Sequence, residues 1–172
     1  MMLRPLFLAM LLTLTAVSPV LAQTCRTETE VPSTTPASRF HDNGDATVTD
    51  QSTGLMWARC PEGLSGSACA DGTVANFTWE AALIRARDSS LAGYTDWRLP
   101  NIKELSSIVE ERCSNPHINL AVFPNTPASF FWSASPEANS SYEAWSVRFY
   151  NGYASNGYRY AGYHVRLVRS GQ

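Results

Sequence analysis

Tyrosine, arginine and small polar residues gather in one short stretch near the C-terminus. Five of the seven tyrosines, Tyr150, Tyr153, Tyr158, Tyr160 and Tyr163, fall there, interleaved with Gly, Ser, Asn and Arg. Antibody paratopes use the same residue types, because Tyr offers a large rigid contact while Ser, Gly and Asn adapt to the ligand. Five phenol hydroxyls in a small core would each need a hydrogen-bond partner. The stretch therefore predicts an exposed ligand-binding surface. The alternative, a surface hairpin that binds nothing, stays open.

Charge at this end of the chain points to the same chemistry. Four arginines and no acidic residue follow Glu143, so the C-terminal end is positively charged and suits an anionic or carboxylate-bearing ligand. The remainder of the chain is acidic, and the formal net charge is −2. A general nucleic-acid binder would be basic overall, so that class is excluded. The side chains expected to contact a ligand are Ser146, Arg148, Tyr150, Tyr153, Ser155, Asn156, Tyr158, Arg159, Tyr160, Tyr163 and His164.

The four cysteines predict two disulfides. An even number of cysteines in an exported chain is typical of disulfide pairing, and four cysteines allow three pairings. Cys60 and Cys69 bracket a short Gly/Ser-rich loop, which favours a local bridge and leaves Cys25 to pair with Cys113. The alternative, a zinc site, lacks cysteine pairs at metal-binding spacing and a nearby histidine.

The first 22 residues read as an export signal. Arg4 precedes an apolar run, Leu6 to Val17, and small or branched residues lead up to Ala22. The run is shorter than the roughly 20 apolar residues that span a bilayer, so no stable membrane span is expected. Residues 23–38 are rich in Thr, Pro and Ser and predict an arm, followed by one domain at 39–172. We expect an exported protein, with periplasm, cell surface and extracellular space left open.

Other candidate sites are weaker. Asp42-Asn43-Gly44-Asp45, with Asp50, offers oxygen ligands for Ca²⁺, but it departs from the EF-hand pattern and favours a turn. Asp96 and Arg98 predict a structural ion pair at a helix start. The three histidines are scattered, and no nucleophile stands beside a base. We therefore expect no metal, no cofactor and no catalysis.

Periodicity predicts two helices and several strands. Strands are expected at 46–50 and 55–58 as a hairpin, then at 130–133, 144–150 and 164–169. In 144–150, Trp145, Val147 and Phe149 should share one face, opposite Ser146 and Arg148. Thr78 should cap a helix over 79–88. Asn101 and Glu104 should form a capping box for a second helix, with an apolar stripe reaching Val109 and Arg112 in its last turn.

Motifs along the chain resemble the Lcl C-terminal domain family. They are Phe40 with Asp42-Asn43-Gly44-Asp45, Thr53-Gly54-Leu55-Met56-Trp57, Asp96-Trp97-Arg98-Leu99-Pro100-Asn101, Phe123-Pro124-Asn125-Thr126, Phe131-Trp132-Ser133 and Val165-Arg166-Leu167-Val168-Arg169. The resemblance covers about residues 39–169. It extends to formylglycine-generating-enzyme and C-type-lectin folds, and it implies an α+β domain with two helices, small antiparallel sheets and long loops. It also implies that Arg166 and Arg169 belong to the scaffold, and it makes a trimer conceivable.

Residues 144–166 resemble the variable region of diversity-generating-retroelement target proteins. The resemblance implies that Tyr150 and the positions from Tyr153 to His164 are randomised in this chain. The scaffold would be held by Trp145, Val147, Phe149, Gly152, Val165 and Arg166. The resemblances imply an exported, non-enzymatic receptor-binding or adhesin-type protein with a protein or glycan ligand. The alternatives are an adhesin for sulfated glycosaminoglycans and, with less support, a catalyst like the formylglycine-generating enzyme.

Overall fold

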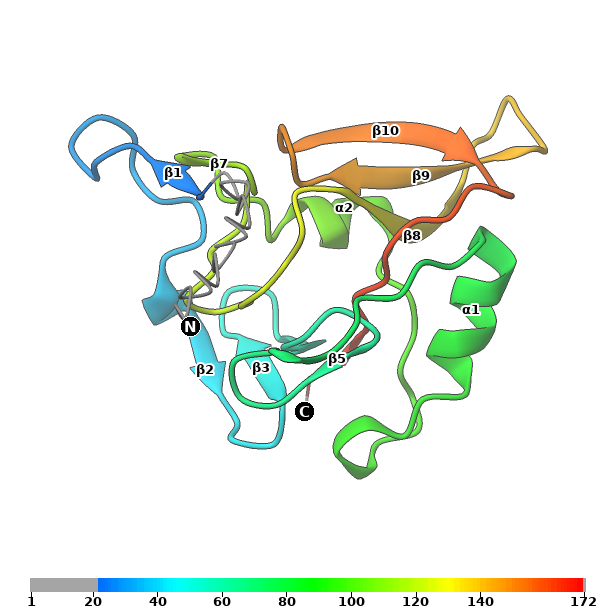
Figure 1. Cartoon of the computed structure of the whole chain (residues 1–172), viewed down its shortest axis with the longest axis horizontal. Coiled ribbons are helices and arrows are strands. Elements are labelled where there is room, and N and C mark those ends of the chain that lie inside the picture. The colour runs from blue at the N-terminus through cyan, green and yellow to red at the C-terminus, as the bar shows by residue number, and fades with distance from the viewer. Residues whose placement is uncertain (1–21, 172) are drawn as a thin grey trace, which may run out of the picture.

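The computed structural model describes residues 22–171, so the predicted export signal at 1–22 lies outside the described residues except for Ala22. Helices and strands alternate with long loops along the chain (Figure 1). The elements are β1 (Thr24–Cys25), β2 (Phe40–Asp42), β3 (Thr47–Asp50), β4 (Leu55–Ala58), β5 (Leu64–Ser65), β6 (Asp71–Gly72), α1 (Trp79–Arg87), α2 (Ile102–Ser106), β7 (Cys113–Ser114), β8 (Phe130–Pro136), β9 (Glu143–Arg148), β10 (Tyr153–Tyr158) and β11 (Val168–Ser170).

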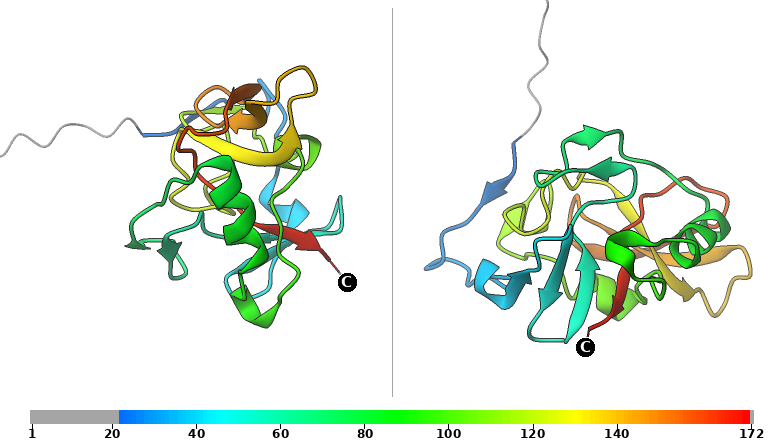
Figure 2. Two further views of the ribbon diagram at one scale, coloured as in Figure 1. Left: turned by 90° about the vertical axis from the view of Figure 1, so that its right-hand side faces the viewer. Right: turned by 90° about the horizontal axis from the view of Figure 1, so that it is seen from below.

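Two larger sheets form the body of the molecule. One has the strand order β10-β9-β8, the other β11-β4-β3-β2, and all their strand pairs are antiparallel. The C-terminal strand β11 pairs with β4 and lies beside the N-terminal half of the domain (Figure 2). Two-stranded ribbons, β1-β7 and β5-β6, complete the structure. The prediction of an α+β fold with two helices and small antiparallel sheets is confirmed.

Helix α1 forms as expected. The Thr78 hydroxyl accepts a hydrogen bond from the amide of Ala81, and the helix runs from Trp79 to Arg87. Ala82 and Ala86 are buried, and Trp79 packs beside them. The helix thus covers one side of the core with its small residues.

Helix α2 has the predicted start and an earlier end. Asn101 and Glu104 form a capping box, and Glu104 also takes two 2.7 Å hydrogen bonds from the Arg98 guanidinium. The helix stops at Ser106, so Arg112 is not in its last turn, and that prediction is wrong. Beyond the helix end the chain leads to Glu110, which turns inward to bind the N-terminal arm, as described below.

The C-terminal segment is also less regular than expected. Residues 164–169 were predicted as one alternating strand, but β11 begins only at Val168. Residues 164 to 169 are all buried, so the expected alternation between buried and exposed side chains is absent from this segment. This segment runs between the two sheets and closes the core.

Arg166 lies in that segment and is fully buried. Its Nη1 donates to the carbonyl oxygen of Ala58 at 2.8 Å and also to that of Arg59, and its Nη2 donates to the Thr126 hydroxyl at 2.6 Å. No carboxylate pairs with it among residues 22–171. Burial lowers the pKa of the guanidinium to about 9, which leaves it charged at neutral pH. The expectation that Arg166 and Arg169 serve the scaffold agrees with their burial.

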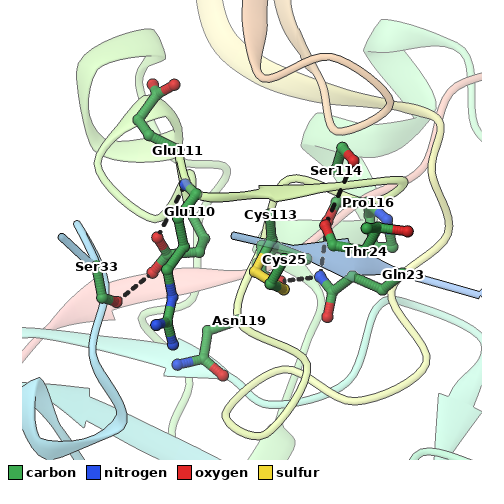
Figure 3. The surroundings of a disulfide bond; sticks show 12 residues. Gln23, Thr24, Cys25, Ser33, Glu110, Glu111, Cys113, Ser114, Pro116 and Asn119 are labelled. Atoms are coloured by element: carbon green, nitrogen blue, oxygen red, sulfur yellow. Dashed lines mark hydrogen bonds between the residues drawn. A yellow bond between two sulfur atoms is a disulfide. The ribbon is translucent and has the colours of Figure 1, made fainter. Parts of the chain in front are cut away.

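Both disulfides join the predicted partners. Cys60 is bonded to Cys69, and Cys25 to Cys113. The second bridge ties the N-terminal arm to the domain beside β1 and β7 (Figure 3). Chain-entropy arguments assign a bridge across so long a loop roughly 4–5 kcal/mol.

Glu110 holds the same arm by hydrogen bonds (Figure 3). Its carboxylate is 1% exposed and accepts bonds from the Ser33 hydroxyl at 2.5 Å, the Thr35 amide at 3.0 Å and the Thr35 hydroxyl at 2.9 Å. Burial by itself would raise the pKa of Glu110, but these hydrogen bonds favour the ionised form and the net pKa is lowered. The predicted arm is therefore fastened to the domain rather than free.

We predict that Arg166→Ala lowers the free energy of unfolding by about 3 kcal/mol or more, because three acceptors lose their donor and a cavity remains. Urea denaturation measures the change. Exposed Arg26 is the matched control, and Arg26→Ala should change stability by no more than about 0.5 kcal/mol. Equal effects of the two substitutions would contradict the role given to Arg166.

We predict that Glu110→Gln lowers stability at pH 7 by about 1–3 kcal/mol, because an amide nitrogen replaces one accepting oxygen. The pKa of the Glu110 carboxyl is lower in the folded chain than in the unfolded chain, where it is about 4.3. As pH falls below about 4.3 and then through the lowered folded pKa, the carboxylate is protonated and its contribution to stability is lost. Unfolding of both proteins from pH 7 to pH 3 should show the difference shrinking with acid. A constant difference would contradict this.

Candidate ligand-binding face

The tyrosine-rich stretch is a strand rather than a loop. Residues Tyr153–Tyr158 form β10, which pairs with β9 in a regular register from Tyr153 opposite Arg148 to Tyr158 opposite Glu143. The strands predicted at 144–150 and 164–169 left no strand between them, and that part of the prediction is wrong. Only a short turn at 149–152 and the segment after Tyr158 are irregular.

Four of the five expected tyrosines are exposed. Tyr150, Tyr153, Tyr158 and Tyr160 have exposed fractions of 58%, 70%, 54% and 75%. Tyr158 and Tyr160 stack in parallel with ring centroids 5.3 Å apart. Tyr153 and Tyr158 lie at the two ends of β10, the outermost strand of the three-stranded sheet in Figure 1. Because side chains alternate along a strand, these two rings project to opposite sides of it, and Tyr150 and Tyr160 lie in the segments that flank it. We call the exposed surface along this edge the tyrosine face.

Tyr142 also belongs to the tyrosine face, and sequence reasoning missed it. It lies in the loop between β8 and β9 and is 75% exposed. The backbone of Arg159 donates to the Tyr142 carbonyl oxygen at 2.9 Å, which brings the loop beside the end of β10. An isolated tyrosine carries no clustering signal, so only the pairing of β8, β9 and β10 could have revealed its place.

Tyr163 points inward. Its ring stacks on Trp132 at 4.2 Å and on Phe130 at 4.6 Å between centroids, and burial raises the pKa of its hydroxyl. Its oxygen approaches Gly157, where an added Cβ would lie 2.5 Å from it. Packing therefore leaves no room for a side chain at Gly157, and the Tyr163 ring packs against the sheet at this position.

Ser146 and His164 are buried as well. Ser146 is fully buried and donates to the carbonyl oxygen of Ser155 at 2.8 Å. His164 is 7% exposed, and its Nδ1 lies 2.9 Å from the carbonyl oxygen of Ala75. Neither side chain reaches the tyrosine face. The alternation predicted for 144–150 fails here, because Ser146 is fully buried while Trp145, expected on the apolar face, is only half-buried.

The two arginines of this region stack on aromatic rings. The Arg148 guanidinium lies 4.3 Å from the Phe130 ring centroid, and that of Arg159 lies 4.4 Å from the Trp79 ring centroid. Arg159 Nε donates to the Glu143 carbonyl oxygen at 3.1 Å. Within residues 22–171 neither arginine has a carboxylate partner. Their charge is therefore available at the margin of the tyrosine face.

A shallow hollow of about 380 Å³ opens beside Arg159, a volume at the low end of small-ligand sites. It lies between the start of α1 and the end of β10. Its lining residues are Thr78, Glu80, Ser141, Tyr142, Arg159 and Tyr160. Two exposed aromatic rings and an anchored guanidinium thus meet at one concave site. Ser155 is partly buried in β10 and Asn156 is exposed on it.

The other candidate sites have structural partners. Asp42 accepts a bond from the Gly44 amide, as a turn requires, and Asp50 is buried against Arg39. Asp96 pairs with Arg169 rather than with Arg98. In the part of the chain that the structure describes, no group of three His, Cys, Asp or Glu side chains could hold a metal ion. No helix in that part is long and apolar enough to cross a membrane.

We predict that Gly157→Ala destabilises the fold by about 1–3 kcal/mol, because the new methyl collides with a tyrosine ring held by stacking. Thermal and urea unfolding measure the effect. Tyr163→Phe, which removes the nearest atom, should restore part of the loss. Gly162 is the control, because an added Cβ there finds its nearest neighbour at 3.4 Å. Similar losses at both glycines would contradict the packing argument.

Comparison with known families supports the resemblance seen in the motifs. Residues 46–169 match the model of the Lcl C-terminal domain family, a range that includes both helices and the tyrosine-rich strand β10. Among curated proteins no match was found. The match covers well over half of the sequence, and the chain belongs to the Lcl C-terminal domain family.

Proposed function

We propose that this protein is an exported, non-enzymatic binding protein of adhesin or receptor-binding type. Its ligand contacts are the rings of the tyrosine face and the guanidinium of Arg159. The observation that carries the proposal is that five exposed tyrosines, Tyr142 included, lie at the ends of strand β10 and in the segments beside it. Soluble proteins rarely leave so much aromatic surface in water without a partner. The family membership is consistent with a ligand-binding role.

The two disulfides are compatible with export, since such bridges persist in oxidising compartments. The family resemblance supports a C-type-lectin-like architecture for the α+β fold. The sulfated-glycosaminoglycan alternative gains less support. Of the four arginines that gave this end its charge, Arg166 and Arg169 are buried and only Arg148 and Arg159 remain near the surface.

Diversification by a retroelement is part of the proposal. Positions free to vary would be those whose side chains face water, Tyr150, Tyr153, Asn156, Tyr158 and Tyr160. Packing argues that Gly157, Tyr163 and His164 are fixed instead. A downstream near-copy of the coding segment, differing only at adenines, would support diversification. A locus with no such copy and no reverse transcriptase would refute it.

We predict that replacing Tyr153, Tyr158 and Tyr160 together with Ser weakens ligand capture at least thirtyfold, because each aromatic anchor contributes about 2 kcal/mol. Capture is measured with a glycan array and with a display library of small protein domains. The melting temperature should stay within a few degrees, because these side chains are exposed.

Ile84 provides the matched control. It is 51% exposed on α1 and is not among the residues that line the hollow beside Arg159, so Ile84→Ser should leave capture unchanged. Undiminished capture by the triple variant would exclude the tyrosine face as the binding surface. A collapsed fold would show that these rings are structural.

A further inference from the structure

The two edges of the three-stranded sheet are not alike. At the β8 edge, the Trp132 amide donates to the His164 carbonyl oxygen at 3.0 Å, and the His164 amide donates to that of Phe130 at 2.9 Å. The C-terminal segment therefore covers this edge. At the other edge stands β10, with no strand beyond it in the described part of the chain (Figure 1).

The direction of the backbone groups in β10 follows from the register of the sheet. On β8, Phe130 and Trp132 bond to His164, away from β9, so the backbone groups of Phe131 point toward its partner Val147 on β9.

The next residue of β9, Ser146, therefore points toward β10, where it pairs with Ser155, and the backbone groups of Ser155 point toward β9. In an antiparallel pair the direction alternates along the strand. The N–H and C=O groups of Ala154 and Asn156, and the N–H of Tyr158, therefore point to the open edge. Ala154 and Asn156 are both exposed.

β10 also lacks the features that usually protect an edge. Edge strands are commonly blocked by charged residues, proline or bulges. The strand Tyr-Ala-Ser-Asn-Gly-Tyr contains no charge and no proline, and its register with β9 is regular over six pairs. By contrast, the bulge of this sheet lies between β8 and β9, away from the open edge.

We propose that β10 is a docking edge to which an extended segment of a partner protein adds as a fourth strand. This inference rests on the proposed binding function and specifies its ligand as a polypeptide. The outward backbone groups of Ala154 and Asn156 recur every second residue, about 7 Å apart, which is the repeat of an extended polypeptide. The Asn156 carbonyl oxygen also accepts a bond from the Ser155 hydroxyl at 3.3 Å and has a second lone pair for a partner. The exposed rings of Tyr153 and Tyr158 stand at the two ends of the strand to contact the partner's side chains.

A second copy of this chain is the competing occupant. Stable homodimers usually bury about 1,600 Å² or more with 20–30 residues on each side. Only Ala154 and Asn156 offer both backbone groups to this edge. So short an edge suits a peptide segment better than a dimer interface.

The test uses the chain from Gln23 to Gln172 and a phage library of random linear decapeptides as the probe. We expect binding peptides to be recovered, and Asn156→Pro, which removes an outward N–H without breaking the β9 ladder, to weaken them at least tenfold. Asn156→Ala removes the same side chain but keeps that N–H and is the matched control, so the Pro variant should bind at least tenfold more weakly than the Ala variant. Equal binding by the Pro and Ala variants overturns the proposal.

Amide hydrogen exchange on the wild-type protein gives a second readout that needs no variant. Peptide binding should slow exchange at Ala154, Asn156 and Tyr158 at least tenfold, and unchanged exchange overturns the proposal. Peptides that lose binding in the triple tyrosine variant but not in Asn156→Pro would leave the binding function standing and exclude strand addition. A dimer in sedimentation that Asn156→Pro converts to monomer would assign the edge to a second copy and overturn the proposal.

Discussion

A buried guanidinium fixes the architecture of this domain. Arg166 lies between the end of β4 and the Thr126 loop, with its guanidinium 4.7 Å from the Phe123 ring centroid. Burying a charge without a carboxylate is costly, so the three oxygen acceptors that surround it must be held in place. The segment that carries Arg166 therefore has one path through the core. That path determines where the residues just before it can lie.

The tyrosine face is a consequence of that path. Val165 and Arg166 are buried, so the chain before them passes over one face of the three-stranded sheet. Tyr163 then packs against Gly157, and His164 pairs with Phe131 of β8. The stretch from Tyr153 to Tyr160 is then left outside, with one edge paired to β9 and the other uncovered. The burial of Arg166 thus accounts both for the fixed interior path of the chain and for the exposed tyrosines outside it. Binding proteins gain affinity from such preorganisation, since fewer side chains are ordered on binding.

Local chemistry was predictable from the sequence, and longer-range packing was not. The capping box at Asn101, the Thr78 cap and the local Cys60–Cys69 bridge depend on nearby residues, and each was predicted. The strand β10 was missed because its sequence has no apolar alternation, and its strand form comes from pairing with β9. The early end of α2 was missed because the apolar stripe continues to Val109, beyond the last helical residue Ser106. For the tyrosine face, clustering identified four exposed rings, whereas the inward turn of Tyr163 and the place of Tyr142 required the sheet.

The central claim is that the exposed tyrosines are the surface that a ligand covers. Photochemically induced nuclear polarisation detects solvent-accessible tyrosine rings one by one, and it can be recorded with and without a saturating captured ligand. The account predicts strong signals from Tyr142, Tyr153, Tyr158 and Tyr160 in the free protein, a weak one from Tyr163, and loss of the strong signals on binding. Strong signals that persist in the complex, or the absence of these signals in the free protein, would contradict the claim that a ligand covers these rings.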